Sequence, residues 1–459
     1  MLGAIVPRPA GEAAPLSWVQ EQLWIQEQVA GGALPYNESV TIKASCWLDA
    51  DVLEKSFAEI VRRHEIWRTS YDTVGGQLVQ VVHPTPFDFP WQVVDLRRLP
   101  DKERGAELLK LTNETARKPF DLRCGPLLQV IFVRLTDTDQ RLLLFAHLSI
   151  LDGVSVYHIF PTELAALYKA FCSGQASPLP ELQIQYADYA LWERQRLNSD
   201  GMTQQLAYWR KQLGGELPDL LWPSCPEKPL QRTFHGALQS FDLSQSLTEM
   251  LKQQSRNHTV TTFTILVASL CALLFSYTRQ TNLVIGTPSA GGRRRSEVQA
   301  LLGNFLNPLA LRINLEGNPS FGELLVRIQL VIAEALTYDD VPIEWLTRER
   351  QAKTNKHCDP LFSVAISLQP QSPATKMEWQ ISSMDVDSGG SVWGLYVAFI
   401  DQADGMVGRV QYNSDLFDSA KISQTIQDLK SLMEFLCSKP ERRISEIVPD
   451  QLSSVADVI

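Results

Sequence analysis

The sequence predicts a mixed α/β protein built from two large lobes. The chain has 459 residues, enough for two or three domains, and an apolar share of 44% is ordinary for a globular protein. Apolar runs typical of strands alternate with segments of helical spacing in both halves. A stretch rich in Ser, Gly and Pro over 173–182 separates these halves. Together these observations favour two α/β lobes joined by a connection.

The first lobe is expected over 16–175, after a loose leader at 1–15 that is rich in Pro, Ala and Gly. Ranges 75–84, 126–135 and 141–147 have the composition of strands, which gives this lobe a sheet. The segment 51–65 has the spacing of a helix packed on a sheet, because its apolar residues fall on one face: Leu53, Phe57, Ile60 and Val61.

The stretch 141–171 organises the first lobe. An apolar strand is followed by a sharp turn at Asp152 and Gly153 and then by helical spacing over 154–171. Pro161 inside that helix should kink or restart it. A strand, turn and helix of this kind can hold polar side chains at a sheet edge, so His147 and Asp152, five positions apart, are the first candidate site residues.

A connection is expected over 176–230 and a second lobe over 231–459. The segment 260–278 is apolar but includes four Thr and two Ser, and a strand follows at 283–288, so we expect a buried helix. No run reaches the eighteen or so apolar residues of a membrane span, and the N-terminus lacks the features of a signal peptide. We therefore expect a cytoplasmic protein that does not contact the membrane.

Composition excludes several classes of function. The formal charge of −10 argues against nonspecific nucleic-acid binding, which needs clustered positive charge. The histidines have no metal-ligand spacing, and no glycine-rich phosphate loop is present. Neither a zinc site nor a disulfide framework is indicated, because seven scattered cysteines contain no Cys-x-x-Cys pair: Cys46, Cys124, Cys172, Cys225, Cys271, Cys358 and Cys437.

The stretch His147 to Gly153 resembles the His-His-x-x-x-Asp-Gly motif of the condensation domains of nonribosomal peptide synthetases, in the chloramphenicol acetyltransferase superfamily. His147, Asp152 and Gly153 match, but the second His falls on Leu148. Other motifs of the family recur in order from residue 17 to about 445: Ser17, Gln20, Leu23 and Trp24; Arg63, His64, Glu65, Arg68 and Thr69; Tyr186, Asp188, Tyr189, Ala190 and Trp192; Tyr208 and Trp209; Gly303, Phe305 and Asn307; Asp340, Pro342 and Glu344.

The resemblance implies two acyltransferase-like lobes that form a V-shaped pseudo-dimer with a central tunnel. Such a domain joins an acyl or aminoacyl thioester, carried on the phosphopantetheine of a carrier protein, to an acceptor amine. It implies no bound cofactor, and its partners would be peptidyl or acyl carrier proteins and other synthetase domains. The family's Asp holds an Arg in a structural salt bridge, so Arg63 or Arg68 is expected to pair with Asp152.

Leu148 replaces the family's second His, which is the supposed base, and leucine cannot accept a proton. The family's catalytic mechanism therefore cannot be assigned to this chain unchanged. Successive side chains of a strand point to opposite faces, so His147 and Leu148 cannot both face the tunnel. His147 is therefore interpreted first as structural, and alternatively as a replacement base. The candidates for contacting substrate or lining the tunnel are Ser149, Ser155, Asn307 and Tyr338.

Three hypotheses of function follow. The first is an amide-forming acyltransferase that works mainly by positioning its substrates. The second is a catalytically inactive module that docks a carrier or recruits a partner enzyme. The third is cyclisation, because relatives that cyclise carry Asp-x-x-x-x-Asp-x-x-Ser, and His147, Asp152 and Ser155 occupy those positions. Arg293, Arg294 and Arg295 are expected to form a solvated loop, with carrier or phosphopantetheine contact as the alternative.

Overall fold

The computed structural model describes residues 3–9, 12–30, 36–196, 202–220, 222, 232–354, 361–369, 379–383, 386–402 and 405–446. Cys225, Cys358 and parts of the expected leader and connection lie outside these ranges. The chain forms two compact units, each of mixed strands and helices. Unit 1 contains Met1–Met202, Ala290–Leu306 and Ser372–Gly390, and unit 2 contains Thr203–Ser289, Asn307–Gln371 and Ser391–Ile459.

Unit 1 is built on a five-stranded sheet in the order β12-β2-β7-β6-β5. Its strands are β12 (Gln380–Ser383), β2 (Asn37–Ala44), β7 (Gln140–His147), β6 (Leu128–Arg134) and β5 (Trp91–Asp95). All neighbours pair antiparallel except β5 and β6. A smaller sheet contains β1 (Ala14–Pro15), β4 (Gln77–Val82) and β3 (Thr69–Val74). The three strands expected at 75–84, 126–135 and 141–147 are confirmed as β4, β6 and β7.

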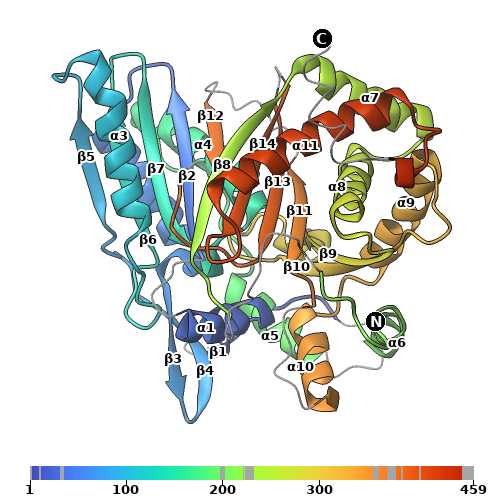
Figure 1. Ribbon diagram of the computed structural model, residues 1–459. Helices are drawn as coiled ribbons and strands as arrows, with labels where there is room; N and C mark the ends of the chain where they lie inside the picture. Colours follow the sequence, from blue (N-terminus) through green and yellow to red (C-terminus); the bar gives the residue numbers. More distant parts are fainter. Residues whose placement is uncertain are drawn as a thin grey trace. The chain divides into compact units, whose positions relative to one another are not determined.

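Alternation along the strands gives the large sheet of unit 1 two apolar faces. Leu142 and Leu144 of β7 join a core that includes Phe57 of α2 (Ala50–Arg63), whereas Leu143 and Phe145 pack with α3 (Asp101–Ala116). Figure 1 shows α3 and α4 (Phe160–Cys172) on opposite faces of this sheet. Unit 1 also contains α1 (Trp18–Val29), α5 (Tyr186–Arg196) and the short helix η1 (Glu65–Arg68).

The helix expected over 154–171 is interrupted, as its proline predicts. A π-helical turn, η3 (Ser155–Ile159), precedes α4, and Pro161 lies in the first turn of α4. Proline is tolerated there because the first N–H groups of a helix have no partner within it. The restart of the helix at Pro161 is thus confirmed, and η3 lies directly after the Asp152 turn.

Unit 2 contains a six-stranded sheet in the order β10-β9-β11-β13-β14-β8. Its strands are β10 (Asn307–Asn314), β9 (Asn282–Ser289), β11 (Val364–Gln369), β13 (Leu395–Gln402), β14 (Gly405–Asn413) and β8 (Gly236–Leu243). Its helices are α6 (Met202–Gln212), whose first residue belongs to unit 1, α7 (Gln245–His258), α8 (Thr262–Thr278), α9 (Phe321–Thr337), α10 (Ile343–Thr354), α11 (Ser419–Ser438) and the short η6 (Ile444–Glu446).

The apolar segment 260–278 forms α8, in which Thr264 to Ser276 are all buried, so the expected buried helix is confirmed. Within the described ranges, no single helix has the length and apolar composition needed to cross a bilayer. Helices α7 and α8 meet that criterion only as a pair, with a bend of 105° between them.

Two excursions of the chain complete unit 1. After β9 the chain leaves unit 2, adds 290–306 to unit 1, and returns to unit 2 with β10. This excursion contains two short helices, η4 (Gly291–Arg294) and η5 (Ser296–Val298). Strand β12 belongs to a second excursion and pairs with the edge of β2. The first of these excursions places Arg293 beside the turn that contains Asp152.

Candidate active site

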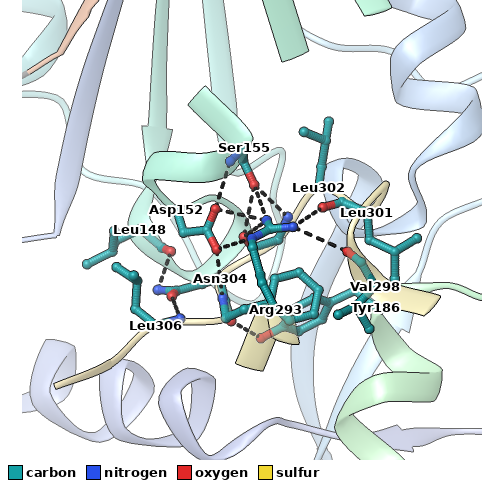
Figure 2. Close-up of polar contacts among 12 residues, drawn as sticks. Leu148, Asp152, Ser155, Tyr186, Arg293, Val298, Leu301, Leu302, Asn304 and Leu306 are labelled. Carbon is teal, nitrogen blue, oxygen red and sulfur yellow. Dashed lines mark hydrogen bonds and ion pairs between the residues drawn. The ribbon is translucent and has the colours of Figure 1, made fainter. Parts of the chain in front are cut away.

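The turn after β7 is held by a buried ion pair between Asp152 and Arg293, both within unit 1 (Figure 2). Arg293 Nε and Nη2 donate to the two carboxylate oxygens of Asp152, each at 2.8 Å. The backbone N–H groups of Ser155 and Phe305 donate to the same oxygens at 2.8 and 3.1 Å. The carboxylate therefore accepts four hydrogen bonds, which offset the cost of burying its charge.

The prediction that Arg63 or Arg68 pairs with Asp152 is wrong. Arg63 and His64 instead bind Glu163 of α4, at 3.1 and 3.0 Å. Burial raises the pKa of Glu163, but His64 and then Arg63 outweigh it, so the pKa lies below its ordinary value. Arg68 donates to the carbonyl of His83.

The expectation of a solvated arginine loop is also wrong for Arg293, whose side chain is only 6% exposed. Its remaining N–H groups donate to the carbonyls of Leu301 at 2.9 Å, Val298 at 3.3 Å and Gly303 at 3.3 Å. Its guanidinium also lies over the ring of Phe305. Arg294 is exposed and Arg295 is half-buried.

Ser155 belongs to the same network. Its Oγ accepts from Arg293 Nη2 at 2.8 Å and from the N–H of Gly303 at 3.1 Å, and it donates to the carbonyl of Gly303 at 3.0 Å. With 1% exposure, this hydroxyl is fully used within the protein. Gly153, in contrast, meets no steric limit, since a Cβ there would have no atom within 4 Å.

His147 is the last residue of β7 and is 1% exposed. Its Nδ1 accepts from the backbone N–H of Ser149 at 3.2 Å and lies 2.8 Å from Ser149 Oγ. We infer that the neutral ring carries its proton on Nε2, because Nδ1 is an acceptor. Nε2 faces Glu27 Oε2 of α1 at 3.8 Å, and neither atom has a hydrogen-bond partner among the described residues.

Leu148 begins a short helix, η2 (Leu148–Ile150), and its side chain is half-buried. Its main chain is fixed at both ends: its N–H donates to the carbonyl of Tyr36 at 2.8 Å, and its carbonyl accepts from Asn304 Nδ2 at 2.9 Å (Figure 2). Of the two adjacent positions, the accessible one is therefore leucine, while the histidine is enclosed by unit 1.

A family model described as "Condensation domain" matches residues 11–453. The chain belongs to the condensation domain family. One of the linear gramicidin synthase proteins of Brevibacillus parabrevis is 37% identical over 438 residues, which cover 95% of this chain and 9% of that protein. This condensation domain therefore spans less than a tenth of the length of that relative. The family match confirms the identification of this chain as a condensation domain.

Solved structures confirm the mixed α/β fold. The first condensation domain of the calcium-dependent antibiotic synthetase has a TM-score of 0.84 at 17% identity, covering 96% of this chain and 99% of that one. The X-domain of teicoplanin biosynthesis, in its complex with OxyB, has a TM-score of 0.81 at 22% identity and covers 98% of each chain. At these identities the likeness shows the fold alone.

The remaining sequence candidates of this condensation domain divide between the two units. Ser149 is fully buried in unit 1 against His147. Asn307 and Tyr338 lie in unit 2. Asn307 Nδ2 donates to the carbonyls of Asp339 and Val341, each at 2.8 Å, and Tyr338 stacks on Tyr208 with ring centroids 4.2 Å apart. The contacts of Asn307 therefore hold the start of α10 in place.

Gln20, Glu27 and Asn304 also lie against this turn and were not identified as site residues. Ser17 caps α1 in a capping box with Gln20, whose Nε2 donates to Tyr71 Oη at 3.1 Å and to the Ser149 carbonyl at 3.4 Å. The Ser-x-x-Gln spacing signals such a cap in the sequence, but not its contact with residue 149. Glu27 and Asn304 have no signal in the sequence that links them to this turn.

The described residues contain no group of three His, Cys, Asp or Glu side chains that could hold a metal ion. A buried histidine with one engaged nitrogen, a buried carboxylate with four donors and an accessible leucine make a rigid scaffold. That scaffold presents no free base in the position of the family's second histidine.

Proposed function

We propose that this condensation domain joins a carrier-bound acyl or aminoacyl thioester to an amine acceptor, and that it acts mainly by positioning the two reactants. The observation that supports this proposal is the intact hydrogen-bond network of Asp152 and Arg293 beside a leucine at position 148. The turn that presents residue 148 is held rigidly although that residue cannot accept a proton. A scaffold that keeps its geometry without its base supports a positioning role.

The reaction balances without a protein base. The acceptor nitrogen attacks the thioester carbonyl, a C–N bond forms, the C–S bond breaks, and the thiol leaves with the proton lost by nitrogen. An α-amino group has a pKa near 7.7–8.0, so on the order of a tenth is free at neutral pH. An alcohol has no such free nucleophile, so we expect amide and not ester products.

The typical contributions of a general base and of positioning favour a mechanism that relies mainly on positioning. A general base typically contributes about 10²–10⁴-fold, equivalent to roughly 3–5 kcal/mol. Holding two reactants in attack geometry can supply about 7–11 kcal/mol. A domain that has lost its base but keeps its positioning can therefore retain the larger share of its rate acceleration.

The experiment measures product mass from substrates loaded on the phosphopantetheine of carrier proteins, with an amine acceptor, a matched alcohol acceptor and a no-enzyme control. Wild-type protein should form amide above the uncatalysed rate. Leu148→His should raise that rate, because the main-chain contacts with Tyr36 and Asn304 keep the new side chain at the family's position. An ester product from the wild type would contradict the positioning mechanism.

A matched pair of variants tests His147. The Oδ1 atom of asparagine can accept from the Ser149 N–H in place of Nδ1, whereas glutamine extends its amide toward the position of Nε2. If His147 is structural, His147→Asn keeps both fold and amide rate, while His147→Gln loses stability. A folded His147→Asn protein that has lost the amide rate would instead assign the histidine a role in the reaction.

The second candidate is a catalytically inactive module that docks a carrier protein or recruits a partner enzyme. Leucine at position 148 is the observation that favours it, and the structurally similar X-domain has been solved in complex with OxyB. This candidate predicts carrier binding without amide product in the wild type and activity only in Leu148→His. The contacts of Ser155 give no support to the cyclisation hypothesis, because its hydroxyl is fully engaged.

A further inference from the structure

One buried arginine of unit 2 has two side-chain nitrogens without a hydrogen-bond partner among the described residues. Arg409, in the middle of β14, is 6% exposed. Its Nε and Nη1 have no hydrogen-bond acceptor in the described part of the chain. Burying a guanidinium that lacks a counter-charge is strongly unfavourable unless something compensates the charge. Arg409 therefore differs from Arg293, whose N–H groups all have acceptors.

The register of the sheet shows on which face Arg409 lies. Gln239 of β8, opposite Val410, donates to the carbonyl of Ser419 at the start of α11. Asp401 of β13, opposite Met406, binds Lys252 of α7. Residues 406 and 410 thus face the helices of unit 2. By the alternation of a strand, Arg409 lies on the opposite face of the sheet.

A row of small and hydroxyl-bearing residues crosses the sheet on that face. Arg409 pairs with Ser240 of β8 on one side and with Ala398 of β13 on the other, and Ala398 pairs with Ser367 of β11. Neighbouring strands are about 4.8 Å apart, so the four side chains form one short row. Ser240, on the edge strand, is exposed, which leaves the row open to solvent from that side.

The surroundings do not neutralise the arginine. Asp242 lies on the same face of β8, but it is exposed and forms no ion pair with Arg409 among the described residues. Ser367 Oγ lies 2.8 Å from Tyr396 Oη, so this hydroxyl pair is neutral. A buried cation beside neutral hydroxyl groups selects for an anion, and a planar guanidinium fits the oxygens of a carboxylate or phosphate.

We propose that Arg409, with Ser240 and Ser367 on the same row, forms a binding site for an oxyanion, either a phosphate or a carboxylate group of a ligand. Arg409, Ser240 and Ser367 all belong to unit 2. It does not depend on whether this domain forms an amide. A phosphate could come from the phosphopantetheine arm of a carrier, and a carboxylate from an amino-acid substrate.

The test titrates the full chain with inorganic phosphate, acetate, phosphopantetheine and pantetheine at constant ionic strength, by calorimetry. Arg409→Met should weaken phosphate or acetate binding about ten- to a hundredfold, as the loss of a charged hydrogen bond does. Arg256→Met is the matched control, because Arg256 is on α7 of the same unit and its side chain is 59% exposed. That variant should bind as the wild type does.

Thermal unfolding supplies a second readout. Without anion, Arg409→Met should keep or raise Tm, because an uncompensated buried charge has been removed. With phosphate or acetate, Tm should rise in the wild type and in Arg256→Met but not in Arg409→Met. Phosphopantetheine binding tighter than pantetheine would identify the phosphate as the ligand group, and tighter acetate binding would identify a carboxylate. Equal oxyanion binding by wild type and Arg409→Met, or no saturable binding by the wild type, would overturn the proposal.

Discussion

Replacing Arg293 with methionine should destabilise unit 1 locally and strongly. The variant leaves Asp152 buried with two donors, the N–H groups of Ser155 and Phe305, in place of four. It also removes the donors to the carbonyls of Val298 and Leu301. Removing one partner of a buried ion pair typically costs about 3–5 kcal/mol. We expect a loss of this size, a large fraction of the usual stability of a domain.

Hydrogen exchange is the suitable assay, since a chain of two units need not unfold in one step. Backbone N–H groups in 150–160 and 290–306 should exchange roughly a hundred- to a few thousandfold faster in Arg293→Met. Arg256 of α7 supplies the control, because its side chain is 59% exposed, and Arg256→Met should leave both segments unchanged.

A second substitution tests the reason for this loss. Asp152→Asn should destabilise the wild type, because it removes the charge that Arg293 binds. In the Arg293→Met background the same change should restore part of the protection, because it removes an unpaired buried charge. Equal destabilisation by Asp152→Asn in both backgrounds would refute the argument that the charge pair carries the energy.

Three further predictions concern stability. Burial raises the pKa of Glu38 from 4.5 to about 7, so the folded state loses stability as pH rises through this window. Glu38→Gln should therefore increase the free energy of unfolding by at most about 3 kcal/mol at pH 8 and leave it unchanged below pH 4.5. Thermal unfolding at the two pH values measures this difference. Gly303→Ala should lower Tm, because φ is +145° and the new Cβ would lie 2.2 Å from the Tyr186 ring; strain and overpacking each cost about 1–3 kcal/mol. Ser17→Ala should cost about 1 kcal/mol through the lost cap with Gln20, measured by denaturant unfolding, and an unchanged midpoint would contradict that role.

Local patterns predicted the elements of this fold well. The apolar run within 141–147 predicted β7, the amphipathic spacing of 51–65 predicted α2, and Pro161 predicted the restart of α4, because each signal depends only on neighbouring residues. The family was likewise readable from short motifs spread along the chain. These features need no knowledge of which distant segments meet.

The partner of Asp152 could not be predicted in the same way. Arg293 lies 141 positions away, in an excursion of the chain between two strands of the other unit. Its Gly-containing, arginine-rich surroundings are typical of a solvated loop, so local composition favoured the wrong assignment. Glu27 was missed for the same reason, since only the packing of α1 brings it within 3.8 Å of His147 Nε2.

The contacts that hold the turn after β7 do not involve the side chain of residue 148. The backbone N–H and carbonyl of residue 148 form hydrogen bonds with Tyr36 and Asn304, and these bonds do not depend on which side chain the residue carries. The Asp152–Arg293 pair fixes the other end of the turn without involving residue 148. A histidine can therefore be replaced by leucine here without loss of the scaffold. Under the proposed mechanism, activity depends on whether positioning alone suffices, and we expect an amine acceptor to meet this condition and an alcohol not to meet it.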